Sequence, residues 1–114
     1  MINIIVKTSN QKIISLEVTG HSGYAVAGKD IVCSAVSTLT EALINGLIDV
    51  VGVSIDYTID EDTPYLKVAL PTNLDETKSH DSQILLKSTV NALKSIWESY
   101  PKFINIKEKK YDQD

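Results

Sequence analysis

Cysteine, phenylalanine and tryptophan each occur only once in this sequence of 114 residues, and aromatic residues make up only 6% of it. A lone cysteine forms no internal disulfide, which excludes a disulfide-rich secreted scaffold and fits a reducing compartment. The chain begins Met-Ile-Asn-Ile-Ile-Val, without the basic region and small-residue cleavage site of a signal peptide. We therefore expect a cytoplasmic location.

Long uninterrupted apolar runs are also missing. The longest, residues 43–53, is broken by Asn45 and Asp49 and is shorter than the roughly 20 residues of a membrane span, so we expect no membrane partner. An excess of basic charge is missing too. Eleven Lys and Arg against 15 Asp and Glu give a net charge of −4, the wrong sign for direct nucleic-acid binding.

What remains is the composition of an ordinary globular domain, with 43% hydrophobic and 23% charged residues. Its length predicts one domain over residues 1–114. Apolar and polar residues alternate over 2–7 and 14–18, which predicts two half-buried strands joined by a turn near Ser9 and Asn10. The same alternation over 53–59 predicts a third strand, with a turn at 61–64 and a hairpin partner at 66–70.

A first helix is predicted after Asp30, a residue suited to an N-cap, with apolar residues at helical spacing from Val32 to Val50. A second apolar stripe makes this helix apolar on more than one side, as expected for a central helix or one at a dimer contact. The second stripe comprises Ile44, Ile48 and Val51.

A second helix is predicted from Ile84 or Leu85 to Tyr100, after a polar connection over 71–81, and Pro101 ends it. A short last strand at 104–106 precedes a frayed tail over 107–114. The element order is β-β-α-β-β-α-β. Because hairpins dominate, we predict a two-layer α+β fold with two helices packed on a mostly antiparallel β-sheet. The sequence does not give the strand order.

Cys33 is the first candidate for chemistry. If Asp30 is the N-cap, Cys33 lies in the first helical turn, where free backbone N–H groups and the helix dipole stabilise a thiolate or a developing oxyanion. The Asp30 carboxylate opposes thiolate formation unless capping the helix or orienting a base occupies it. A lone cysteine in an apolar helix is also commonly a small buried hydrophobe, so both interpretations stay open.

His21 is the second candidate. It lies in a glycine-flanked loop that returns to the helix start, so it can reach Cys33 as general base and later as general acid. A Cys–His pair is the minimal set for thiol-based acyl transfer, although a solvated loop histidine fits equally well. His80, among polar residues, is expected to be solvated. Two histidines and one cysteine without matching spacing predict no metal site.

Other residues have weaker signals. Ser37 follows Cys33 by one helical turn on the same face, either as part of the site or as a serine bonding a helix carbonyl. Gly23 and Gly28 are turn residues or hinges for loop closure. The glycines match no nucleotide-binding spacing, and we expect no cofactor. Solvent exposure explains the acidic cluster that contains Asp56 and Asp60.

The string Gly-His at 20–21, followed by Gly-Lys-Asp-Ile-Val-Cys-Ser-Ala-Val-Ser at 28–37, resembles the motif of the ribosomal-processing cysteine proteases, the Prp family. The resemblance implies that Cys33 is the nucleophile and His21 the base, with Asp30 and Ser37 in supporting positions. It assigns four further positions to oxyanion binding and the loop: Ser34, Gly20, Gly23 and Gly28.

The resemblance also implies a function. Such proteins remove a short N-terminal extension from a large-subunit (50S) ribosomal protein, the twenty-seventh, by cutting after two aromatic residues through an acyl-enzyme. They are commonly homodimers with a flexible glycine-rich loop over the site. The rival hypothesis is a non-catalytic, ribosome-associated binding module in which the cysteine is structural. A thiol redox sensor ranks last, because no second cysteine resolves a sulfenic acid.

Overall fold

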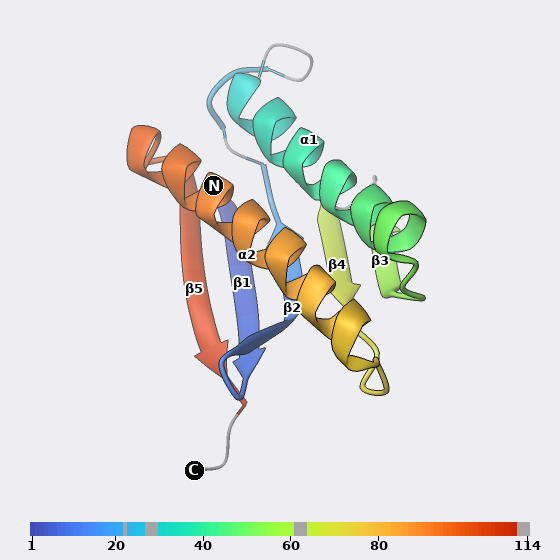
Figure 1. Cartoon of the computed structure of the whole chain (residues 1–114). Helices are drawn as coiled ribbons and strands as arrows, with labels where there is room; N and C mark the ends of the chain where they lie inside the picture. Colours follow the sequence, from blue (N-terminus) through green and yellow to red (C-terminus); the bar gives the residue numbers. More distant parts are fainter. Residues whose placement is uncertain (22, 27–29, 61–63, 112–114) are drawn as a thin grey trace.

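The computed structural model describes residues 1–21, 23–26, 30–60 and 64–111. These described residues form five strands and two long helices in the predicted order, which confirms the two-layer α+β class (Figure 1). The elements are β1 (Ile2–Ser9), β2 (Lys12–Thr19), α1 (Ile31–Asn45), the π-helical segment η1 (Gly46–Val51), β3 (Asp56–Asp60), β4 (Tyr65–Ala69), α2 (Glu76–Ser99) and β5 (Ile104–Lys110).

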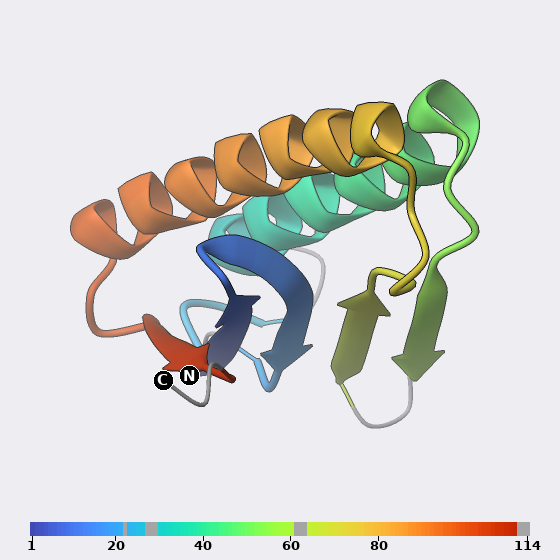
Figure 2. The ribbon, with the colours of Figure 1, turned by 60° about the horizontal axis from the view of Figure 1, so that its bottom comes forward.

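The strands form one sheet in the order β3-β4-β2-β1-β5. Three of its pairings are antiparallel, and β1 and β5 run parallel. Asn10 and Gln11 make the predicted turn between β1 and β2, both with positive φ, at 52° and 66°. Figure 2 shows both helices on the same face of the sheet; no helix of the described residues covers the other face.

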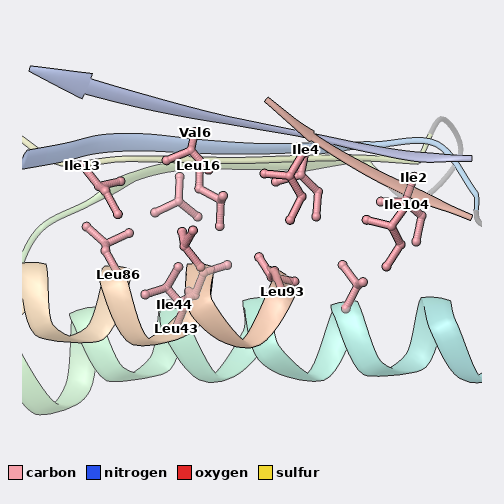
Figure 3. Close-up of a cluster of buried hydrophobic side chains, with 14 of the residues drawn as sticks. Ile2, Ile4, Val6, Ile13, Leu16, Leu43, Ile44, Leu86, Leu93 and Ile104 are labelled. Atoms are coloured by element: carbon pink, nitrogen blue, oxygen red, sulfur yellow. The ribbon is translucent and has the colours of Figure 1, made fainter. Parts of the chain in front are cut away.

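The core fills the space between the sheet and the helices. Side chains from β1, β2 and β5 point toward α1 and α2, as Figure 3 shows for Ile4, Leu16 and Ile104, and Leu93 of α2 points back toward the sheet. These branched aliphatic residues are the ones that alternate along the predicted strands or repeat along the predicted helices, so burying one apolar face of each element forms a single core.

The first helix changes geometry near its end. It is α-helical to Asn45, then π-helical over η1, and it ends at Gly52 with a positive φ of 83°. The prediction that Val50 continues the buried stripe is wrong, because Val50 is 82% exposed. A π-helix closes its hydrogen bonds five residues apart, so the helical spacing no longer keeps Val50 on the buried face.

Residues 31–51 together form a helix that is long and apolar enough to cross a membrane, by length and composition alone. The expectation from sequence considered only uninterrupted apolar runs. It did not find this stretch, because the helix continues through the polar residues Asn45 and Asp49. In the fold its most buried side chains pack in the core, among them Val32, Leu43 and Leu47.

The second helix begins earlier than predicted. Residues 76–81, assigned to a polar connection, already belong to α2, and Asp75 caps it by accepting a hydrogen bond from the Lys78 backbone N–H at 2.8 Å. Its first turn is polar because it faces solvent. Ile84 is 56% exposed, whereas Leu85 packs against the core, so Leu85 is the one of the two that belongs to the apolar face of the helix.

Two strand boundaries also differ from the prediction. β5 continues to Lys110, where the sequence predicted a frayed tail, because backbone pairing with β1 extends to Thr8 without needing apolar side chains. β3 begins only at Asp56, and all five of its residues are exposed, since it is an edge strand. The predicted turn at 61–64 falls mostly outside the described residues.

Candidate active site

A cavity of about 650 Å³ lies where the start of α1, the segment after β2 and the β3–β4 hairpin meet. We call it the active-site cavity. It brings together nearly all of the predicted site residues, namely Gly20, His21, Gly23, Asp30, Cys33, Ser34 and Ser37. Gly28 lies outside the described residues. The cavity therefore unites the candidate nucleophile and the candidate base, which are 12 positions apart in the sequence.

The start of α1 holds Cys33 in place. Asp30 is the N-cap and is 7% exposed; its Oδ1 accepts from the Cys33 backbone N–H at 3.0 Å. The Asp30 carbonyl accepts from the Ser34 N–H, also at 3.0 Å. Both of these N–H groups of the first turn, where the sequence predicted stabilisation of a thiolate or an oxyanion, thus already have acceptors at the helix start. Ser34 and Ser37, which follow Cys33 by one and four positions and carry hydroxyl groups, also line the cavity.

Gly20 sets the course of the chain into His21. Its φ is +88°, and a Cβ at this position would lie 2.5 Å from the Met1 carbonyl oxygen, so only glycine fits. The Gly20 N–H donates to the Pro64 carbonyl at 3.0 Å. These contacts tie the segment after β2 to the N-terminus and the hairpin end, and the exposed His21 follows at the cavity.

Tyr24 holds the same segment at a second point. Its ring makes edge contacts with Tyr100, at a centroid distance of 5.5 Å, and with Phe103, at 5.3 Å. Such edge-to-face pairs contribute roughly 0.5–1.5 kcal/mol each beyond area burial. The sequence analysis did not identify this anchor. The available signal was an aromatic side chain in an otherwise small-residue loop, in a chain with few aromatics.

The sheet side of the cavity was also missed. Ile59 and Asp60 at the end of β3, and Tyr65 and Leu66 at the start of β4, line it together with Glu41 of α1. The sequence analysis explained Asp60 as a solvent-exposed acidic residue, but Asp60 also lines the cavity. These residues were not foreseen because the strand order, which places the hairpin end beside α1, is not readable from a single sequence.

His80 lies elsewhere, as predicted. Its Nδ1 is 3.2 Å from the Asp81 Oδ1 and its side chain is 74% exposed. Within the described part of the chain, no three His, Cys, Asp or Glu side chains are grouped closely enough to hold a metal ion. The chemistry that the cavity offers is thus that of a thiol and an imidazole beside an apolar wall, the set that acyl transfer requires.

Comparisons with known proteins agree with this chemistry. A profile of the cysteine protease Prp family matches residues 1–105. The ribosomal processing cysteine protease Prp of Bacillus subtilis is 31% identical over 101 residues, which cover 88% of this chain and 90% of that protein.

Two solved structures show the same fold. A Streptococcus mutans protein matches with a TM-score of 0.84 and 30% identity, covering 96% of this chain and 95% of that one. The ribosomal processing protease Prp of S. aureus, solved with a covalently linked product peptide, matches with a TM-score of 0.86 and 22% identity, covering 96% and 100%.

Proposed function

Because this chain belongs to the cysteine protease Prp family, we propose that it removes the N-terminal extension of a large-subunit (50S) ribosomal protein, the twenty-seventh. The chain is a cysteine protease, which excludes the non-catalytic binding module with a purely structural cysteine. The observation that carries the proposal is the cavity shared by Cys33 and His21, with the first turn of α1 beneath the thiol.

In the proposed reaction, His21 takes the proton of the Cys33 thiol, and the thiolate attacks the carbonyl carbon of the scissile peptide bond and forms a new S–C bond. The C–N bond then breaks, and His21 donates its proton to the leaving amine. Water, deprotonated by His21, then attacks the thioester carbon; the S–C bond breaks, the acid leaves, and His21 returns the proton to the Cys33 sulfur. The negative oxygen of each tetrahedral intermediate would be stabilised by the hydroxyls of Ser34 and Ser37, because the Cys33 and Ser34 N–H groups are already engaged.

The apolar wall of the cavity supports a substrate with aromatic residues before the cleaved bond. Val18 of β2, Leu66 of β4 and Ile59 of β3 contribute this wall. Ile59 is half-exposed, so contact with an aromatic side chain removes its surface from water at about 25 cal/mol per Å². An aromatic pair ahead of the scissile bond therefore suits this wall better than charged residues do.

We further propose a homodimer that acts in the cytoplasm without a cofactor. Large apolar side chains exposed on the consecutive elements η1 and β3, outside the cavity lining, support the homodimer, since exposed apolar surface is typical of interfaces. They are Ile48, Val50 and Tyr57. Sedimentation velocity tests this: a species of monomer mass at micromolar concentration contradicts it.

The decisive experiment for the reaction is mass spectrometry of the precursor ribosomal protein after incubation with wild type or with Cys33→Ala. We expect one cut after the aromatic pair with wild type and none with the variant, at an unchanged melting temperature. Thr38→Ala, an exposed position on the same helix and outside the cavity lining, is the matched control and should cut normally. Cleavage by Cys33→Ala would exclude Cys33 as nucleophile, and a folded, inactive wild type would exclude this substrate.

A further inference from the structure

The active-site cavity continues along α1 away from the nucleophile. Cys33, Ser37 and Glu41 follow one another at intervals of four residues, and all three line the cavity. Glu41 is exposed. Asp60 lines the cavity from the sheet side. Among the described residues that line it, none is a lysine or an arginine. Glu41 therefore places a negative charge eight residues along α1 from the thiol, in a lining without a basic side chain among its described residues.

We propose that Glu41 makes the enzyme prefer substrates with a lysine or arginine three or four residues from the cleaved bond. This inference rests on the proposed peptidase function. Eight residues of α-helix separate Cys33 from Glu41, a rise of about 12 Å. An extended peptide advances about 3.3 Å per residue, so a chain lying along the helix passes Glu41 between its third and fourth residue from the thiol.

The location of Glu41 gives its charge a selective effect. Its carboxylate lies at a cavity whose wall includes the apolar side chains of Val36 and Leu66, and low-dielectric walls concentrate the field of a charge. Glu41 is also solvent-exposed, so the attraction is modest and salt-sensitive. We expect kcat/KM to be about fivefold higher for a peptide with lysine at the matching position than for one with glutamine, at low ionic strength.

The test uses the full chain and a series of peptides that share one cleavable aromatic pair. A single lysine is moved one position at a time on either side of the cleaved bond, with glutamine elsewhere. For wild type, we expect a maximum of kcat/KM when the lysine is three or four residues from the bond on one side. The maximum should be smaller in about 0.5 M salt, where the screening length falls to a few ångströms.

Two variants and one control isolate Glu41. Glu41→Gln should bring the lysine-to-glutamine rate ratio close to one, and Glu41→Lys should reverse the preference toward peptides with glutamate at that position. Glu98→Gln makes the same charge change on the exposed end of α2, outside the cavity lining, and should leave the ratio as in wild type.

The outcomes separate this inference from the proposed function. Efficient cleavage of all peptides at equal rates would overturn the role of Glu41 and leave the peptidase intact. A lysine preference that persists in Glu41→Gln would likewise overturn it and assign the selection to another residue. Failure of the folded wild type to cleave any peptide would overturn the proposed function and this inference together.

Discussion

The two ends of the sheet use the same kind of interaction for different purposes. Beside the active-site cavity, Asp30 is 7% exposed and binds the backbone N–H of Cys33. At the other end, Gln83 of α2 is also 7% exposed and binds two backbone groups of Ile13, the N–H and the carbonyl, each at 2.8 Å. Both are buried polar side chains that satisfy backbone groups.

The surroundings of these two side chains differ. Gln83 joins α2 to the start of β2, and its amide satisfies both of the Ile13 groups within the fold. Around Asp30, the hydroxyl groups of Ser34 and Ser37 and the imidazole of His21 border a cavity. The Gln83 amide is thus satisfied within the fold, whereas the site end presents polar groups to a substrate. Mutations at the far end should change stability, and those at the site end should change activity.

The largest expected effect belongs to the site end. His21→Ala should lower the single-turnover rate of peptide cleavage by about 10²–10⁴-fold, because general acid–base catalysis contributes factors of that size. The melting temperature should not change, since His21 is exposed. His80→Ala is the control, because His80 is exposed and pairs only with its neighbour Asp81 among the described contacts. A loss below tenfold for His21→Ala would remove it from the mechanism.

The next effect belongs to the far end. Gln83→Leu leaves the Ile13 N–H and carbonyl buried without their partners and should lower the free energy of unfolding by about 2–3 kcal/mol. Urea unfolding measures this loss, and kcat/KM per folded molecule should stay at the wild-type value. Ile84→Ala, the exposed neighbour, should cost about 0.5 kcal/mol or less. A loss of activity without a loss of stability in Gln83→Leu would break the division between the two ends.

A smaller effect is expected at the two helix N-caps, which make the same kind of hydrogen bond. Asp30 caps α1 and Asp75 caps α2, each by accepting from the N–H three residues later. Replacing either by alanine should cost about 1 kcal/mol of stability. Only Asp30→Ala should also lower kcat/KM, because only α1 carries the nucleophile. Asp30→Asn keeps an accepting oxygen and should retain the stability; equal activity losses in Asp30→Ala and Asp75→Ala would contradict the comparison.

The sequence predicts most of the strands and helices and most of the residues around the thiol, but not all of the site. Alternation and helical spacing give the elements, because burying one face of each element leaves a periodic pattern. The motif at 20–37 gives the residues around the thiol, since they are close in sequence or joined by one loop. Glu41, Asp60 and Leu66 reach the same cavity through the strand order and the packing of α1 on the sheet, and no local pattern encodes those contacts.

At the far end, too, local patterns are readable from the sequence and contacts between distant residues are not. Gln83 is one polar residue within a helix, and nothing in its neighbours indicates that its amide meets Ile13, 70 positions earlier. The end of α1 was misjudged for a local reason: the π-helical turn changes the spacing just where the apolar stripe seemed to continue. Long-range polar contacts and changes of helix geometry therefore needed the structure.

The smallest effect concerns Lys7 and Tyr111, which also lie at the far end. The Lys7 ammonium is 5.1 Å from the Tyr111 ring centroid, and a hydrogen bond between the two side chains, followed by their electrostatic attraction, lowers the pKa of Tyr111 and raises the pKa of Lys7. A lowered pKa means that the Tyr111 phenol ionises before an ordinary phenol does, below pH of about 10. In an ultraviolet titration of tyrosinate, Tyr111→Phe should remove the earliest part of the rise, and Lys7→Met should delay it. Because neither side chain lines the active-site cavity, kcat/KM at neutral pH should stay unchanged in both variants; a changed rate would connect the far end to the site.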